Sequence, residues 1–283
     1  MKISLAISVI TIFLLSSCES PRYIYAVTPQ NLPSLKKKGD FQADAFYSTN
    51  GTTSYVDDTE SSHYSNGIDG NAAVAITNHL AITGSLGYRW EKNQYDGYYD
   101  GISNLSAAGV KYYRMNWEVG TGYYSSIHRQ DKVFFQIFGG VGTGRYSIDD
   151  KGFLYDPNTG SSASYTRFHN SNVFRFYLHP AVHFYFNEYF SMAVAGKMTN
   201  IHYSDIRTDY SLVEQQNYRL QDLDGKTFTM FEPCIDLKLR IPGAEWIAPH
   251  MQFTFSTYLQ SYDTRKANAS FGITIMTPKR KND

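Results

Sequence analysis

Residues 80–90 read LAITGSLGYRW, and apolar side chains occupy nearly every second position, from Leu80 to Trp90. Small or polar side chains, ending in Arg89, occupy the positions between them. Successive side chains of a β-strand point to opposite faces, so this period of two predicts a strand with one apolar face. The eleven residues are also enough for a tilted strand to cross a bilayer, which takes about 9–11.

The same alternation recurs along the chain after residue 40, and helical patterning is nearly absent. Long polar connections alternate with short ones, as in outer-membrane barrels with short periplasmic turns and longer external loops. We therefore expect an all-β fold, an antiparallel up-and-down transmembrane β-barrel of about ten strands, over residues 40–277. The expected strands are roughly 41–48, 70–77, 80–90, 109–125, 132–146, 172–186, 189–203, 226–241, 249–261 and 267–277. The expected long loops lie near 49–69, 91–108, 147–171 and 204–225, with a shorter one near 262–266.

The composition excludes several other classes of protein. The 283 residues carry 26 basic and 26 acidic side chains, and 16% of all residues are aromatic. A disordered chain would be poor in aromatic residues, and a nucleic-acid-binding protein would show a basic excess. Two cysteines are too few for a disulfide scaffold.

Residues 1–17 have the pattern of a secretory signal. Lys2 precedes an apolar run from Ile3 to Leu15, which is short for a membrane-spanning helix. The run ends in Leu-Ser-Ser-Cys18, which resembles the bacterial lipobox. The resemblance implies cleavage before Cys18 and acylation of its sulfur and new amino group. The alternative is an ordinary secretory signal with a cysteine placed by chance.

The segments flanking the expected barrel show no strand pattern. Residues 18–39 hold three of the nine prolines and the basic run Lys36–Lys38, so we expect a lipidated tether and a lead-in to the first strand. Residues 278–283 form a short, mostly basic tail. With Cys18 acylated, Cys234 would have no partner for a disulfide. An even number of strands would place both termini on the periplasmic side of the membrane.

Alternation alone does not separate a membrane barrel from a soluble sandwich, because both have the same period. Three features favour the barrel. The polar faces carry Gly, Ala, Tyr, Arg and His instead of a solvated Lys/Glu/Asp mixture, aromatic residues gather at segment ends, as at Tyr123 and Tyr124, and the chain carries an export signal. The alternative is a soluble, lipid-tethered periplasmic β-protein that binds a small ligand.

If the apolar faces meet lipid, the opposite faces line a lumen with charges of both signs. Buried charges are tolerated when they are paired and hydrogen-bonded. Glycines on this face, such as Gly120 and Gly140, would leave room for long side chains such as Tyr177 or Lys197. A narrow barrel filled in this way is plugged, and the alternative is an open channel. The expected lumen network is Arg89, Glu118, Arg175, His179, His183, Lys197, Glu232, Asp236, Lys238 and Arg240.

No catalytic, cofactor or metal site emerges from the sequence. His179 and His183 share a face, but four residues of strand separate them by about 13 Å, too far to ligate one metal together. A less favoured alternative is an outer-membrane hydrolase with its site at the outer rim. The rim candidates are His202 with Asp205 and Asp209, and His169 with Ser171. Nothing orders them into a triad, so we expect no enzyme and no cofactor.

The expected partners follow from the surface. The barrel wall would contact outer-membrane lipid, and the neutral charge balance argues against nucleic acid. The long loops are rich in Tyr, Asp, Asn, Ser and Gly, a composition that can bind envelope proteins or glycans. We therefore expect a structural or binding role, exercised through the external loops.

Several short stretches together resemble the lipobox-bearing outer-membrane β-barrel proteins of Bacteroidota. The match covers most of the chain and implies an outer-membrane barrel without an established activity. It includes Pro180 and Pro233, which fall inside expected strands and would mark a bulge or bend. The stretches are the lipobox at Cys18, Pro33 to Asp40, Ala75 to Leu80, Glu118 to Tyr124, Phe138 to Gly144, His179-Pro180 and Glu232-Pro233.

Overall fold

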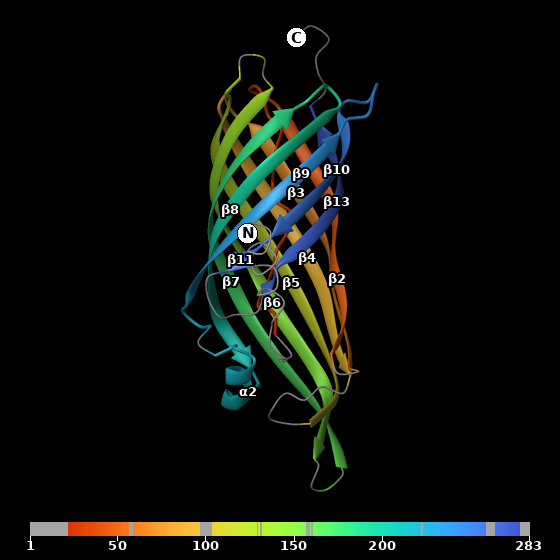
Figure 1. Ribbon diagram of the computed structural model, residues 1–283. Helices are drawn as coiled ribbons and strands as arrows, with labels where there is room; N and C mark the ends of the chain where they lie inside the picture. Colours follow the sequence, from red (N-terminus) through yellow and green to blue (C-terminus); the bar gives the residue numbers. More distant parts are fainter. Residues whose placement is uncertain are drawn as a thin grey trace, which may run out of the picture.

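Ten antiparallel strands close into a barrel (Figure 1). The computed structural model of the chain describes residues 22–56, 59–96, 104–128, 130, 132–156, 159, 161–221, 223–258 and 264–277. Each strand pairs with its neighbour in sequence, and the ring closes where β13 pairs with β2 and β10 pairs with β9. The prediction of an all-β, antiparallel, ten-stranded barrel is therefore confirmed.

The wall is built from β2 to β10 and β13, and the remaining elements are short. The wall strands are β2 (Phe41–Val56), β3 (Thr59–Ala75), β4 (Leu80–Asp96), β5 (Asn104–Ser126), β6 (Val133–Asp156), β7 (Ser161–Tyr185), β8 (Phe190–Thr208), β9 (Thr227–Leu239), β10 (Ile247–Phe255) and β13 (Ala267–Met276). The short elements are β1 (Tyr25–Ala26), α2 (Leu212–Asn217), β11 (Thr257–Tyr258) and β12 (Thr264–Arg265). The described residues contain no helix long and apolar enough to span a membrane.

The outer face of the wall carries exposed apolar side chains in a period of two. Ile68 is 60% exposed, Phe176 56% and Ile273 55%, while the residues between such positions are buried inside. An exposed apolar surface that continues from strand to strand is far larger than the isolated patches of a soluble monomer. The structure therefore places the apolar faces outward, as a lipid-facing wall requires.

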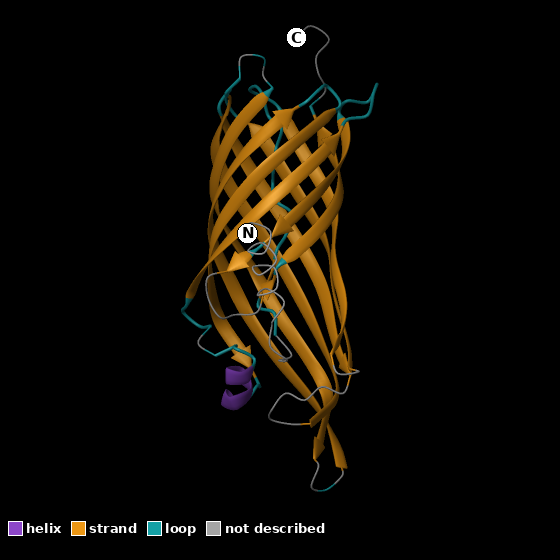
Figure 2. Cartoon of the chain, viewed as in Figure 1, coloured by secondary structure: helices purple, strands orange, loops and turns teal. Residues whose placement is uncertain are grey.

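Several strands continue into the regions where the sequence pattern predicts loops (Figure 2). The loops expected at 49–69, 91–108 and 147–171 are largely strand, because the strand pairs β2–β3, β4–β5 and β6–β7 continue into these ranges. The start of β7 reads Ser-Ser-Ala-Ser and is exposed on both faces, so no alternation marks it as a strand. Backbone pairing with β6 nevertheless continues there in register.

The short connections lie at the opposite end of the barrel and are held by side-chain oxygens. Thr77 Oγ1 accepts hydrogen bonds from the backbone N–H groups of His79 and Leu80, at 3.1 and 2.9 Å. Asn187 Oδ1 does the same for Tyr189 and Phe190, at 2.8 and 2.7 Å. Such local bonds close tight turns between neighbouring strands.

The two prolines within strands do not shift the strand register. The pairing of β7 with β8 breaks off after Leu178 and resumes at Ala181 in the same register, and Pro233 of β9 lies opposite Gly196. A proline removes one ladder bond, and here it does so without an inserted residue. Of the predicted bulge or bend, the bulge is therefore absent at both prolines; the register shifts of the described strands lie at Leu105/Ala107 and Asn170/Asn172.

The segment before the first wall strand passes through the lumen. Val27 and Leu32 are each 1% exposed, and β1 forms a short parallel pair with β12. At the short-turn end the segment reverses at Gly39, where φ is +84°, and Lys38 N–H donates to Asn78 Oδ1 at 2.9 Å. The tether expected over residues 18–39 is therefore wrong for the described part, because residues 22–35 fill the barrel.

The two ends of the described chain lie towards opposite ends of the barrel. Arg22 pairs with Asp150, far along β6 from the short turn where that strand begins. Thr277 N–H donates to the carbonyl of Phe41, at the short-turn end. We assign the long-loop end to the exterior, as in other outer-membrane barrels. With this assignment Arg22 lies towards the external end, and the periplasmic side of both termini stays a prediction.

Candidate functional site

The candidate site is the filled lumen, and the structure places nearly all the predicted polar residues there. Arg240 differs, because it follows the end of β9, is only half-buried, and donates to the backbone carbonyl of Glu188 at 3.4 Å. Its place is the short-turn rim and not the lumen. The predicted residues that lie buried inside the barrel are Arg89, Glu118, Arg175, His179, His183, Lys197, Glu232, Asp236 and Lys238.

Glu118 of β5 lies between two cations from the nearby strands β7 and β8. Lys197 Nζ is 2.6 Å from its Oε2, and Arg175 Nη1 is 3.6 Å from its Oε1. All three side chains are buried, so the paired charges offset part of the cost of removing each from water. Glu118, Arg175 and Lys197 therefore form one ion-pair cluster on this side of the lumen.

Glycines on β5 and β6 make room for Tyr177, as the sequence predicts. A Cβ added at Gly120 would lie 2.2 Å from the Tyr177 hydroxyl, and one at Gly140 would lie 2.6 Å from it. Lys197 Nζ in turn lies 4.6 Å from the centre of the Tyr177 ring. Tyr177 of β7 is paired with Gly140 of β6, which is paired with Gly120 of β5, so its side chain lies over the two glycines along the same inner face.

The N-terminal segment supplies partners that the wall residues would otherwise lack. Tyr25 donates its hydroxyl proton to Glu232 Oε1 at 2.7 Å, and Thr199 of β8 donates to Oε2 of the same carboxylate at 3.2 Å. Lys238 Nζ donates to the backbone carbonyl of Leu32 at 2.8 Å and lies 3.6 Å from Asp236 Oδ2. The lumen network therefore includes the segment as a structural member.

Gln30 is bonded to the wall through both its backbone and its side chain. Its backbone N–H and C=O exchange two hydrogen bonds with the side-chain amide of Gln252, each at 2.9 Å. Its own side chain donates to the carbonyl of Glu232 at 2.7 Å and lies 2.9 Å from His179 Nε2. These four contacts join the segment to β7, β9 and β10 at once.

The histidines of the lumen are spread among polar partners. His250 Nδ1 lies 3.2 Å from Asp236 Oδ1, whereas His179 contacts Gln30 and His183 lies further along β7. Among the described residues, no group of three or more His, Cys, Asp or Glu side chains is placed to hold a metal ion. Cys234 is a buried free thiol with Thr254 Oγ1 3.5 Å from its sulfur.

Sequence reasoning missed several ion pairs nearer the external end. Arg22 pairs with Asp150 at 2.6 Å, Arg89 pairs with Asp69 at 3.3 Å, and Glu91 binds both Arg114 and Arg265. Asp69, Glu91 and Asp150 fall in stretches that were expected to be loops, so their inward positions were not counted. The period of two continues through Arg89, Glu91 and Asn93, and this pattern could have predicted that Glu91 points inward.

The buried charges of the described residues balance. The wall and β12 contribute six buried cations and seven buried carboxylates, and Arg22 of the segment is the seventh cation. Neutrality therefore requires the segment. The cations are Arg22, Arg89, Arg114, Arg175, Lys197, Lys238 and Arg265. The carboxylates are Asp44, Asp69, Glu91, Glu118, Asp150, Glu232 and Asp236.

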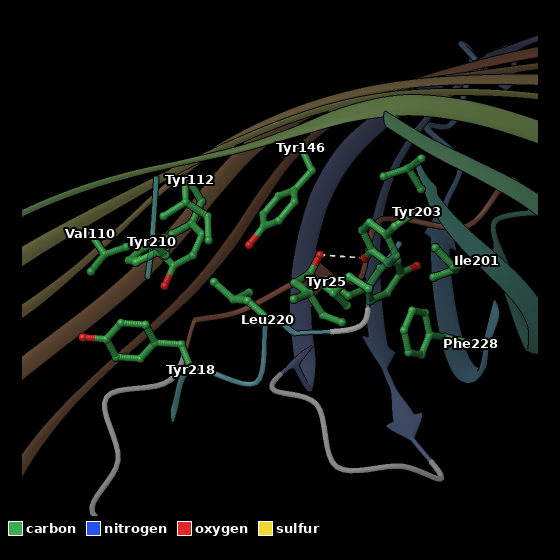
Figure 3. Close-up of a cluster of buried hydrophobic side chains, with 14 of the residues drawn as sticks. Tyr25, Val110, Tyr112, Tyr146, Ile201, Tyr203, Tyr210, Tyr218, Leu220 and Phe228 are labelled. Atoms are coloured by element: carbon green, nitrogen blue, oxygen red, sulfur yellow. Dashed lines mark hydrogen bonds between the residues drawn. The ribbon is translucent and has the colours of Figure 1, made fainter. Parts of the chain in front are cut away.

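An aromatic cluster fills the external half of the lumen (Figure 3). The connection that carries α2 folds into it, since Tyr210 and Tyr218 are buried there and Arg22 lies 4.0 Å above the Tyr218 ring. Tyr210 donates to Asp150 at 2.7 Å. Burial raises the pKa of Tyr210 well above its usual range, with the Asp150 carboxylate adding to the effect, so the hydroxyl stays a donor.

Among the described residues, no hydrogen bond joins the candidates for a rim hydrolase to one another. His169 is 0% exposed, and neither ring nitrogen has a hydrogen-bond partner among the described residues. His202 alternates with the buried Ile201 and Tyr203, so its side chain lies on the outer face. Asp205 instead accepts a hydrogen bond from Asn172 at 2.8 Å.

Comparison with known proteins agrees with this architecture. No protein-family model and no curated protein matches the sequence. The translocator domain of the autotransporter NalP from Neisseria meningitidis is similar at 10% identity, covering 87% of this chain and 90% of that chain, with a TM-score of 0.52. The outer membrane protease OmpT from Escherichia coli is similar at 8% identity, covering 86% and 96%, with a TM-score of 0.44. The chain has the fold of an outer-membrane β-barrel, and at these identities the likeness extends to the fold alone.

Proposed function

We propose that this protein is a sealed outer-membrane barrel that acts by binding partners at its external end. The observation that carries the proposal is the path of residues 22–35, which fill the lumen and complete its charge balance. A solute could cross only if this segment and its partners moved. Breaking one buried ion pair alone costs about 3–5 kcal/mol, so an open state would be rare.

The external end offers a binding surface made mainly of strand. The β6–β7 hairpin projects beyond the other strands and carries exposed serines and Thr166. Such a surface can form hydrogen bonds with envelope proteins or glycans, which we propose as partners. We propose no catalytic role, since His169 is buried and His202 faces outward.

We also propose that the chain is anchored by a lipid on Cys18. This residue lies outside the described residues, and the support is the lipobox-like sequence that precedes it. Arg22, the nearest described residue, lies towards the external end of the barrel. Four residues span at most about 14 Å. The anchor would therefore attach to the membrane from the external side, in place of the periplasmic anchor expected from the sequence.

Conductance in planar bilayers tests the proposal. The full-length protein should show no sustained open-pore current, and a variant lacking residues 22–35 should conduct. Heat-modifiable migration in SDS gels establishes that each preparation is folded. A steady open-pore current from the folded full-length protein would contradict the sealed barrel, whether or not the deletion variant folds. The alternative of a soluble, lipid-tethered protein predicts no heat shift and release from membranes once the anchor is removed.

A further inference from the structure

A hollow of about 450 Å³ opens at the short-turn end of the barrel. It lies where the lumen segment meets the β3–β4 turn and the junction of β5 with β6. The lining combines ammonium, imidazole, amide and hydroxyl groups, and it contains no carboxylate among the described residues. The lining residues are Lys36, Lys37, Asn78, His79, Ser125, Ser126 and Phe134.

Hydrogen bonds within the turns hold this lining in place. Asp40 Oδ2 accepts from the backbone N–H groups of Lys36 and Lys37, at 2.8 and 3.0 Å. Lys38 N–H donates to Asn78 Oδ1 at 2.9 Å, which directs the amide –NH₂ of Asn78 away from that bond. The His79 ring stacks on Tyr123, with 5.7 Å between ring centres. The cationic groups are therefore carried by an ordered backbone.

The charge around the hollow is positive. Among the described residues of the short-turn end, cationic side chains outnumber carboxylates by five to three. The cations are Lys36, Lys37, Lys38, Lys132 and Arg240, and the carboxylates are Asp40, Glu188 and Glu245. Lys36 Nζ lies 4.4 Å above the Tyr185 ring, so it contributes positive charge near the hollow. Positive charge beside amide and hydroxyl donors suits a phosphate group, which accepts several charge-assisted hydrogen bonds.

The lipid-facing wall begins directly beside the hollow. Leu80 is 45% exposed, Tyr123 43% and Ile127 65%, all on the outer surface at this end. Acyl chains packed on these side chains would hold a headgroup at the level of Lys37 and Asn78. From this juxtaposition we propose that the hollow binds a phosphate group, carried by a phospholipid of the periplasmic leaflet. The leaflet follows from the orientation assigned above.

The sharpest variant is Asn78→Asp, which keeps the oxygen that accepts from Lys38 and adds a negative charge to the lining. Asn187→Asp is the matched control, because Asn187 Oδ1 also accepts backbone hydrogen bonds at the short-turn end, from Tyr189 and Phe190, and Asn187 lies outside the hollow. Native mass spectrometry of the full chain in maltoside micelles would count bound dioleoyl phosphatidylglycerol, with dioleoylglycerol as the phosphate-free probe. Calorimetry with inorganic phosphate would test the anion alone.

We expect phosphatidylglycerol to be retained over dioleoylglycerol, with at least a tenfold loss of affinity in Asn78→Asp and none in Asn187→Asp. Stronger binding of the lipid than of inorganic phosphate identifies a membrane lipid as the source, and equal binding identifies free phosphate. Equal retention of the two lipids without phosphate binding would overturn the proposal. So would equal binding by Asn78→Asp and the unmodified protein.

Discussion

Arg22 donates two hydrogen bonds to Asp150 across the lumen, from Nε at 3.0 Å and from Nη2 at 2.6 Å, and both side chains are fully buried. The two residues are 128 positions apart in the chain. Their pairing fixes the external end of the lumen segment against β6. In the described part of the chain, Arg22 is also the buried cation that makes the number of buried cations equal to the number of buried carboxylates.

Asp150→Asn should destabilise the barrel and loosen its N-terminal segment. The change leaves the buried guanidinium of Arg22 without its carboxylate, at a cost of about 3–5 kcal/mol. Urea unfolding in lipid vesicles measures the effect. Asp149→Asn is the control, because Asp149 is the half-buried neighbour on the other face of β6. Arg22→Met combined with Asp150→Asn removes the unpaired guanidinium and keeps an oxygen that can accept from Tyr210, so it should recover part of the lost stability. Equal losses in Asp150→Asn and Asp149→Asn would argue against the pair.

Gln30→Leu should also weaken the attachment of the segment. The substitution leaves the side chain of His179 and the carbonyl of Glu232 without their partner, at about 1–3 kcal/mol for each group. Limited proteolysis of the folded protein should then cut within residues 22–35 faster than in the unmodified chain. Gln94→Leu, at an exposed site on β4, should leave the cleavage rate unchanged. Protection of the segment in Gln30→Leu would show that these bonds do not hold it.

Gly120→Ala should cost about 1–3 kcal/mol through overpacking, since its Cβ would lie 2.2 Å from the Tyr177 hydroxyl. Gly84→Ala is the control, because the nearest atom to its Cβ is a backbone oxygen at 3.9 Å. The temperature of the heat shift in SDS gels compares the two. Adding Tyr177→Phe to Gly120→Ala should restore part of the lost stability. An unchanged shift temperature in Gly120→Ala would show that the Tyr177 hydroxyl does not lie against Gly120.

The lumen segment runs from the external end to the short-turn end, so the two chain ends should be accessible from different sides. An epitope inserted between Ser20 and Pro21 should bind antibody on intact cells. One placed after Asp283 should bind only after the outer membrane is permeabilised. If neither epitope is labelled on intact cells, the N-terminus lies on the periplasmic side and the assigned orientation is wrong.

The wall strands could be predicted from the sequence because a lipid-facing strand needs an apolar side chain at every second position. Stretches such as Leu80–Trp90 must present apolar side chains at every second position, and this rule predicted the barrel and the inward side of Glu118 and Lys197. Beyond the lipid the rule no longer applies, so Ser161–Ser164 pair as strand without alternating. The pairing of Arg22 with Asp150 was also beyond reach, since it depends on which side chains meet across a closed lumen.

The most direct test of the account is a disulfide between the lumen segment and its partner strand. Tyr25 and Thr264 are paired residues of β1 and β12, so Tyr25→Cys with Thr264→Cys should crosslink in the folded membrane protein, in a Cys234→Ser background. The wall pair Ala43→Cys with Ala72→Cys, opposite each other on β2 and β3, controls for oxidation. Both pairs should crosslink. A crosslinked wall pair with Tyr25→Cys and Thr264→Cys both still reduced would contradict a lumen filled by the N-terminal segment.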